Sequence, residues 1–190
     1  MWHWVSCSDR RFRAAGVAIA AALVATPAPA KVFATREQAL ATAFGTDATV
    51  QRKAEYLDEA DLARVRAAAG AGVDVRAGLV TRYAGIREGR IVGHAYLDTH
   101  RVRTLQETVM IVVGPDDRVM AVEVLAFGEP VDYLPKPGWL AQFAGRALDD
   151  ELAVKRGIHG ISGATLSADA VADAARRVLA VHRVLRETGR

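Results

Sequence analysis

The sequence predicts a single α+β domain in which an antiparallel sheet meander lies between flanking helices. Three observations indicate this fold. Four β-rich segments joined by short turns occupy the middle of the chain, and such strands must run antiparallel because parallel neighbours need long crossovers. Helical patterns precede and follow these strands. The length of 190 residues, 51% of them hydrophobic, fits one core with a short N-terminal appendage.

Residues 1–30 have the pattern of a cleavable signal peptide. Arginines cluster at 10–13, an Ala-rich apolar segment covers 14–25, and small residues suited to cleavage lie at 28–30. Prolines interrupt the apolar segment after about a dozen residues, whereas a membrane helix needs about 20, so an uncleaved anchor is the weaker alternative. Two adjacent arginines leave the twin-arginine route open. We therefore expect an exported, periplasmic chain with one domain over 31–190.

Charge and cysteine content exclude several classes of function. The formal net charge is +3, and removing residues 1–30 takes away three arginines and one aspartate, which leaves +1. Nucleic-acid binding therefore has no electrostatic support. The single cysteine, Cys7, lies within the predicted signal peptide. The mature chain would then have no disulfide, thiolate ligand or cysteine nucleophile.

The helices and strands are predicted in order along the chain. A weak helical pattern covers 36–44, and a second helix follows Asp58, which can cap it, and ends before Gly70. Two hairpins follow, with strands at 79–83, 91–97, 108–113 and 119–125 and with turns at 88–89 and 114–117. The charged residues Arg101, Arg103 and Glu107 surround the turn between these hairpins, where charges are usually solvated.

The C-terminal third is predicted to contain an ordered loop, which is not a linker to another domain, and the most regular helix of the chain. A Pro-rich stretch covers 129–137, and a short helix is expected around 139–143. The last helix runs from Ser167 to about Glu187, where apolar residues recur on one face. These are Val171, Ala174, Val178, Val181 and Leu185.

The junction before this last helix carries the residues best suited to chemistry. Gly160, Gly163 and Ala164 are small enough to let another group approach the backbone. Hydroxyls of Ser162, Thr165 and Ser167 lie at or near the start of the helix, where unpaired amides and the helix dipole favour an anion such as phosphate. An ordinary Ser/Thr helix cap uses the same residue types. From the residues alone, both interpretations stay open.

The segment Ser162-Gly163-Ala164-Thr165, followed by Leu166-Ser167, resembles the flavinylation motif of the FMN-binding domain family. That family includes small periplasmic-facing subunits of Rnf complexes and of the sodium-translocating NADH:quinone oxidoreductase, as well as soluble exported domains. The resemblance covers about 79–187 and includes the hairpin over 112–125, Glu129-Pro130 and residues 139–145 in the order that the family uses.

The resemblance implies a flavoprotein that carries electrons. In the family, a periplasmic flavin transferase moves FMN from FAD onto the motif threonine, here Thr165, through a phosphoester bond. We therefore expect covalent FMN and exchange of electrons with membrane-bound redox proteins, in a carrier more than a self-sufficient enzyme. One position departs from the family pattern, because His159 stands where an aspartate is common, six residues before the threonine.

The FMN site implied by the resemblance combines two segments. Glu129 and Pro130 match a family position near the flavin, while Tyr133 and Trp139 either line the ring or fix the Pro-rich loop on the core. A tethered phosphate limits the reach of the cofactor, so both segments should adjoin one cleft. The predicted cofactor-binding residues are Thr165, Ser162, Gly163, Ala164, Leu166, Ser167, Glu129, Pro130, Tyr133 and Trp139.

Three alternatives compete with a flavin carrier. A nonredox exported module could bind an anion or another ligand at the same loop. His94, Asp98 and His100 share one face of an extended strand and could hold a metal, although outward polar residues on a half-exposed sheet give the same pattern. An esterase elbow would need glycine where Ala164 stands, and the predicted antiparallel sheet does not fit that doubly wound fold.

Overall fold

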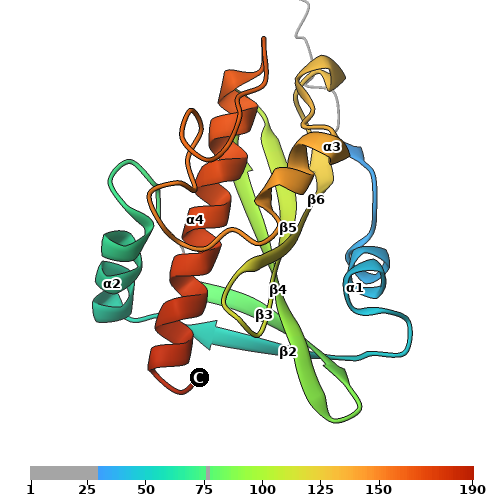
Figure 1. Ribbon diagram of the computed structural model, residues 1–190, viewed down its shortest axis with the longest axis vertical. Helices are drawn as coiled ribbons and strands as arrows, with labels where there is room; N and C mark the ends of the chain where they lie inside the picture. The colour runs from blue at the N-terminus through green and yellow to red at the C-terminus, as the bar shows by residue number, and fades with distance from the viewer. Residues whose placement is uncertain (1–29, 76–77) are drawn as a thin grey trace, which may run out of the picture.

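The computed structural model describes residues 30–75 and 78–190, so the predicted signal peptide, apart from Ala30, lies outside the described residues. Six antiparallel strands form one open sheet in the order β1-β6-β5-β4-β3-β2, with helices on both faces (Figure 1). The strands are β1 (Lys31–Val32), β2 (Thr49–Tyr56), β3 (Leu79–Arg87), β4 (Arg90–Arg101), β5 (Gln106–Val113) and β6 (Val119–Phe127). The predicted α+β class and the antiparallel meander are confirmed.

Most helices lie where the sequence predicts them. They are α1 (Arg36–Phe44), α2 (Glu59–Ala69), the 3-10 helix η1 (Val131–Tyr133), α3 (Pro137–Leu140), the 3-10 helix η2 (Ala141–Phe143) and α4 (Thr165–Glu187). The carboxylate of Asp58 caps α2 as predicted, accepting the N–H of Asp61 at 2.8 Å. The last helix begins two residues earlier than predicted, at Thr165.

Both predicted hairpin turns form, and each contains residues with positive φ. Glu88 and Gly89 have φ of 51° and 72° between β3 and β4, as a tight two-residue hairpin requires. Asp117 has φ of 62° between β5 and β6, where the N–H of Gly114 donates to the carbonyl of Arg118 at 2.8 Å. Short polar turns therefore hold the meander in register.

The sequence did not predict the two edge strands. The short strand β1 pairs with β6, and β2 pairs with β3 over eight residues. In β2 only Glu55 is buried, and Arg82 of β3 pairs with it at 2.9 Å. An edge strand with so little apolar burial lacks the alternation by which strands are recognised.

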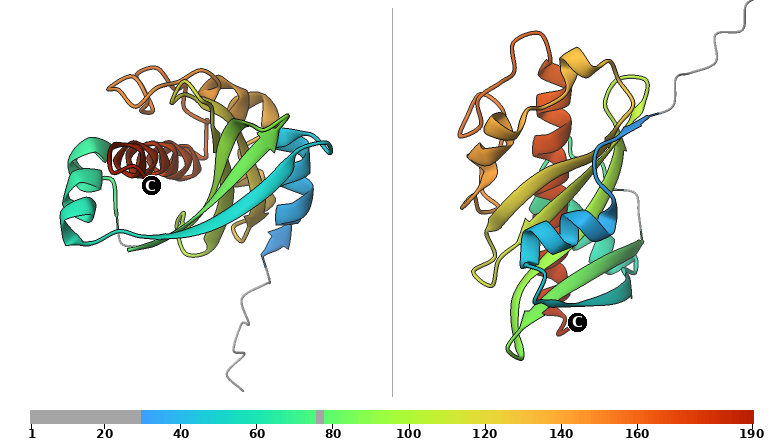
Figure 2. Two further views of the ribbon diagram at one scale, coloured as in Figure 1. Left: turned by 90° about the horizontal axis from the view of Figure 1, so that it is seen from below. Right: turned by 90° about the vertical axis from the view of Figure 1, so that its right-hand side faces the viewer.

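Two hydrophobic cores lie on opposite faces of the sheet. The larger one joins the sheet to α2 and α4, and includes the whole predicted apolar stripe of α4. The smaller one packs Leu40 and Phe44 of α1 against the other face. Figure 2 shows α4 end-on, between α2 and the sheet. This central position explains why more than half of the residues of α4 are buried.

Polar residues of β4 face α4, which corrects the expectation that they point outward. Tyr96 is 1% exposed, and its hydroxyl lies 2.8 Å from Nδ1 of His182 on α4. Asp98 accepts two hydrogen bonds from Arg177 of α4, at 2.7 and 2.8 Å. Because helices cover both faces of the sheet, these side chains must be paired within the protein.

Glu107 also departs from its predicted place in a solvated turn. It lies on β5 opposite His100 and is fully buried. His100 contacts Asp98 through Nδ1 at 2.9 Å and Glu107 through Nε2 at 3.1 Å. Burial opposes protonation of His100, but the two carboxylates raise its pKa to about 9. Burial raises the pKa of Glu107, and its Oε1 has no hydrogen-bond partner among the described residues.

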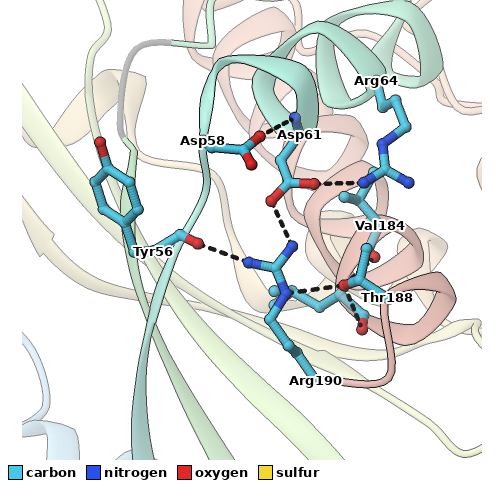
Figure 3. Close-up of polar contacts among 8 residues, drawn as sticks. Tyr56, Asp58, Asp61, Arg64, Val184, Thr188 and Arg190 are labelled. Atoms are coloured by element: carbon cyan, nitrogen blue, oxygen red, sulfur yellow. Dashed lines mark hydrogen bonds and ion pairs between the residues drawn. The ribbon is translucent and has the colours of Figure 1, made fainter.

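The C-terminal end of α4 is tied to α2 and β2 by a charged network. The guanidinium of Arg190 pairs with Asp61 and donates to the carbonyl of Tyr56 at 2.7 Å (Figure 3). Arg64 pairs with the other oxygen of Asp61. Hydrogen bonds from Arg190 and Arg64 lower the pKa of Asp61, against the effect of its burial. The network therefore fixes the far end of the helix.

Candidate functional site

The first turn of α4 starts without a side-chain cap. The N-cap residue is Ala164, with φ of −130° and ψ of 44°, and no side chain accepts a hydrogen bond from the first turn. The alternative of an ordinary Ser/Thr cap is therefore wrong. The first N–H groups of a helix lack partners within the helix, and they add to the positive end of its dipole. The turn is thus electrically suited to an anion.

Small residues leave the backbone before this turn open. Gly163 has φ of 79°, a conformation that side chains disfavour, and a Cβ built there would meet nothing within 4 Å. Ala164 is buried, while Thr165 and Leu166 are exposed. The hydroxyl-bearing Thr165 therefore stands at the surface, beside a stretch of accessible main chain.

A cavity of about 270 Å³ adjoins this turn. The start of α4 lies at the top of the view in Figure 1. Three segments far apart in sequence form its wall: the connection between β4 and β5, the segment that follows β6, and the start of α4. The lining residues are Val102, Arg103, Glu129, Tyr133, Gly163, Ala164, Thr165, Leu166 and Ser167. The expectation that the motif and the Glu129 region adjoin one cleft is met.

Three of the residues proposed for cofactor binding do not line this cavity. Ser162 lies in the exposed turn before it, and Pro130 precedes η1 as its N-cap. The indole of Trp139 donates to the carbonyl of His159 at 2.7 Å, and its ring packs against Phe143 at 5.4 Å between centroids. Trp139 therefore fixes the loop before the motif, which is the packing role considered for it.

His159, the position that departs from the family pattern, is exposed and held by its main chain. Its N–H donates to Oε1 of Gln142 at 2.7 Å, while its carbonyl accepts from Trp139. The loop is thus attached to η2 through the N–H of His159 and to α3 through its carbonyl. The imidazole does not line the cavity.

Glu129 organises the part of the cavity wall formed by the connection between β4 and β5. Its Oε1 accepts the N–H groups of Leu105 at 2.7 Å, Thr104 at 2.6 Å and Arg103 at 3.2 Å. These hydrogen bonds, led by that of Leu105, hold the pKa of Glu129 below its usual range. An ionised Glu129 therefore shapes the connection between β4 and β5.

Val102 and Arg103 complete the wall and were missed from the sequence. The sequence predicts a solvated charge at a turn, yet Arg103 lines the same cavity as Thr165. Its side chain is exposed, and within the described part of the chain it forms no ion pair or hydrogen bond. The sequence offers no signal for it, because only the fold of residues 102–105 around Glu129 turns Arg103 toward the motif.

The alternative sites find no matching geometry in the described residues. Over 30–75 and 78–190 there is no group of three or more histidine, cysteine or acidic residues arranged to hold a metal. Both ring nitrogens of His100 are engaged by carboxylates instead. The sheet pairs only antiparallel strands, so the doubly wound sheet of an esterase is absent from these residues.

Comparison with known proteins finds a family match over most of the residues that line the cavity, all but Val102 and Arg103. Residues 105–180 match the family model described as FMN-binding domain. The matched stretch contains Glu129, Tyr133 and the whole motif up to Ser167. The predicted resemblance is thus confirmed, and FMN is the cofactor it supports. No curated protein and no solved structure matches the chain.

Proposed function

We propose that this chain, which matches the FMN-binding domain model over residues 105–180, is an exported electron carrier with FMN esterified to Thr165. The observation that carries the proposal is the position of Thr165. Its hydroxyl lies at the first residue of α4, exposed, on an uncapped helix start that lines the cavity. A phosphate on this hydroxyl would meet the amides and dipole of the first turn.

The residues around the cavity fit FMN in their chemistry. Val102, Tyr133 and Leu166 offer apolar surface to a planar aromatic ring, and the latter two are 37% and 53% exposed. Gly163 allows close approach to the main chain. The flavin ring, when bound, supplies the capacity to accept and release electrons. The protein supplies the tether, the orientation and the local charge.

The covalent step requires a second enzyme that can reach Thr165. A flavin transferase would join Oγ1 of Thr165 to the phosphorus of the FMN half of FAD. The phosphoanhydride bond of FAD breaks, AMP leaves, and the hydroxyl proton of Thr165 is released. An exposed threonine beside open backbone is accessible to such an enzyme, whereas the buried Ser167 is not.

Export and membrane redox partners belong to the same proposal. Their support is the signal-peptide pattern of residues 1–30, and we expect a mature N-terminus near Lys31. Among the described helices, none has the length and hydropathy of a membrane span. N-terminal sequencing of the native protein tests this part. A chain that keeps Met1 and stays in the cytosol would refute export.

Co-expression with a periplasmic flavin transferase tests the function. The wild-type protein should gain the mass of one FMN less one water and give a fluorescent band after denaturation. Thr165→Ala should lose both completely, while the neighbouring Ser162→Ala should retain attachment. Thr165→Ser restores a hydroxyl and should recover labelling. His159→Asp should raise the yield if the common acidic residue aids recognition.

The outcomes separate the flavin carrier from the alternatives. Labelling that persists in Thr165→Ala would refute the attachment site. A protein that binds FMN only reversibly would remain a flavoprotein but lose the covalent step. A colourless protein under all conditions would favour a nonredox module that binds another anion at the same turn.

A further inference from the structure

We propose that Arg103 is the cationic anchor for the FMN phosphate, and that Glu129 positions it. This inference rests on the proposed FMN site and adds a specificity-determining residue from outside the motif. Arg103 and Thr165 line the same cavity of about 270 Å³. A phosphate next to Thr165 is therefore within the space that the side chain of Arg103 borders.

The guanidinium of Arg103 is free to accept an anion. Most arginines of the described chain have partners, such as Arg177 with Asp98 and Arg190 with Asp61. Arg103 forms no such pair within the described residues. Arginine presents planar donors that match phosphate oxygens, and a hydrogen bond between charged groups is stronger than one between neutral groups.

The carboxylate of Glu129 does not neutralise this cation. Glu129 also lines the cavity, but its Oε1 is taken up by three main-chain N–H groups of residues 103–105. The oxygen therefore acts on the backbone that carries Arg103, and it fixes where the side chain of Arg103 starts. Glu129 is thus a positioning residue whose charge is partly compensated by amides.

The lining offers both kinds of surface that FMN needs. Val102, Tyr133 and Leu166 are the apolar contributors, while the start of α4 and Arg103 are the positive ones. The apolar side chains suit the aromatic ring, and the positive groups suit the phosphate. Arg103 should therefore matter for FMN and hardly for riboflavin, which has the same ring and no phosphate.

Titration of the unloaded full-length mature protein with FMN and with riboflavin tests this inference. Flavin fluorescence at low salt reports both affinities. The wild-type protein should prefer FMN, and Arg103→Gln should reduce that preference about tenfold, the loss expected for one charged hydrogen bond. Arg103→Lys should recover part of it. Glu129→Gln should act in the same direction by loosening residues 103–105.

Arg90→Gln is the matched control. Arg90 has the same charge and no ion pair in the described residues, but it begins β4, whereas Arg103 follows the end of that strand. The 12 residues of β4 span about 36 Å when extended, which exceeds the Debye length at physiological salt several times. The FMN preference of Arg90→Gln should equal that of the wild type.

A second measurement covers the loaded protein. The ³¹P resonance of the attached FMN should shift in Arg103→Gln and stay in place in Arg90→Gln. An unchanged FMN preference and an unchanged resonance in Arg103→Gln would overturn the inference while leaving the flavin site intact. A wild-type protein that binds neither flavin and takes up no label would instead overturn the proposed function, and this inference with it.

Discussion

The two ends of α4 differ in how their polar groups are satisfied. Beyond its first turn, the helix forms an ion pair from Arg177 to Asp98 and a hydrogen bond between His182 and Tyr96. After its last turn, Arg190 forms an ion pair with Asp61 of α2 (Figure 3). The first turn of α4 has no side-chain cap and opens onto a cavity. Side-chain contacts thus hold one end of the helix, while its other end stays available to a ligand.

Removal of the ion pair that joins α4 to β4 should have the largest effect on stability. Arg177→Met removes both hydrogen bonds to Asp98, which is only 12% exposed, and should lower the free energy of unfolding by about 3 kcal/mol. Denaturant unfolding at neutral pH measures it. Arg183→Met is the control on the same helix, because Arg183 is exposed and reaches only the carbonyl of Leu148 at 3.4 Å. If both variants lost the same free energy of unfolding, the ion pair of Arg177 with Asp98 would not be a special contribution to stability.

The pH dependence of stability should have opposite slopes on the two sides of about pH 6.5. Burial, aided by His182, lowers the pKa of His94 to about 4, so the unfolded chain binds the proton more tightly. Stability is then lost as pH falls from 6.5 toward 4. The pKa of His100, raised to about 9, gives stability that is present below pH 6.5 and lost as pH rises through 9.

Substitution of each histidine shows which residue causes which pH dependence of the free energy of unfolding. Each group should contribute on the order of 1 kcal/mol per pH unit within its window. Unfolding curves at pH 5.5, 7 and 9 should show that His100→Asn flattens the alkaline side and that His94→Asn flattens the acid side. A wild-type alkaline slope retained in His100→Asn would show that another group is responsible.

Removing one neutral hydrogen bond should have a smaller effect. Tyr96→Phe keeps the packing of a ring that is 1% exposed but leaves Nδ1 of His182 without its partner at 2.8 Å. The expected loss is about 1–2 kcal/mol in the free energy of unfolding. Flavin labelling at a temperature where the variant is folded should not change, since neither residue lines the cavity. Reduced flavin labelling of folded Tyr96→Phe would show that the contacts in the middle of α4 affect the site at its first turn.

The smallest stability effect is expected beside the open end. Gly163→Ala should cost about 1 kcal/mol, because φ of 79° strains any side chain although the surrounding space is open. Gly160→Ala is its control, since Gly160 has no positive φ and a Cβ there makes only an ordinary contact at 3.6 Å with Val154. Matching thermal midpoints for the two variants would argue against a conformational need for Gly163.

The sequence predicted those parts of the fold that depend on local pattern. Turn residues such as Glu88-Gly89 and the apolar stripe of α4 act over short distances, so their elements were found. The edge strand β2 was missed because pairing with β3, and not its own hydrophobic pattern, makes it a strand. Glu107 was expected in solvent because nothing local shows that α4 covers that face.

The candidate site also has a part that local sequence predicts and a part that depends on distant contacts. The motif around Thr165 is contiguous, and its resemblance to a family made it visible in the sequence. Arg103 was missed because its place depends on three main-chain hydrogen bonds to Glu129, which is 26 residues away. Trp139 was considered as a ring contact, whereas its indole is committed to the carbonyl of His159.

Peptide mapping of the loaded wild-type protein locates the residue that carries the flavin. Trypsin should release residues 157–176 as one peptide, because Arg156 and Arg176 bound it, and this peptide contains Ser162, Thr165 and Ser167. Tandem mass spectrometry should place one FMN, less one water, on Thr165 and leave both serines unmodified. Flavin on Ser162 or Ser167, or on a peptide outside this segment, would contradict the claim that the open end of α4 carries the cofactor through Thr165.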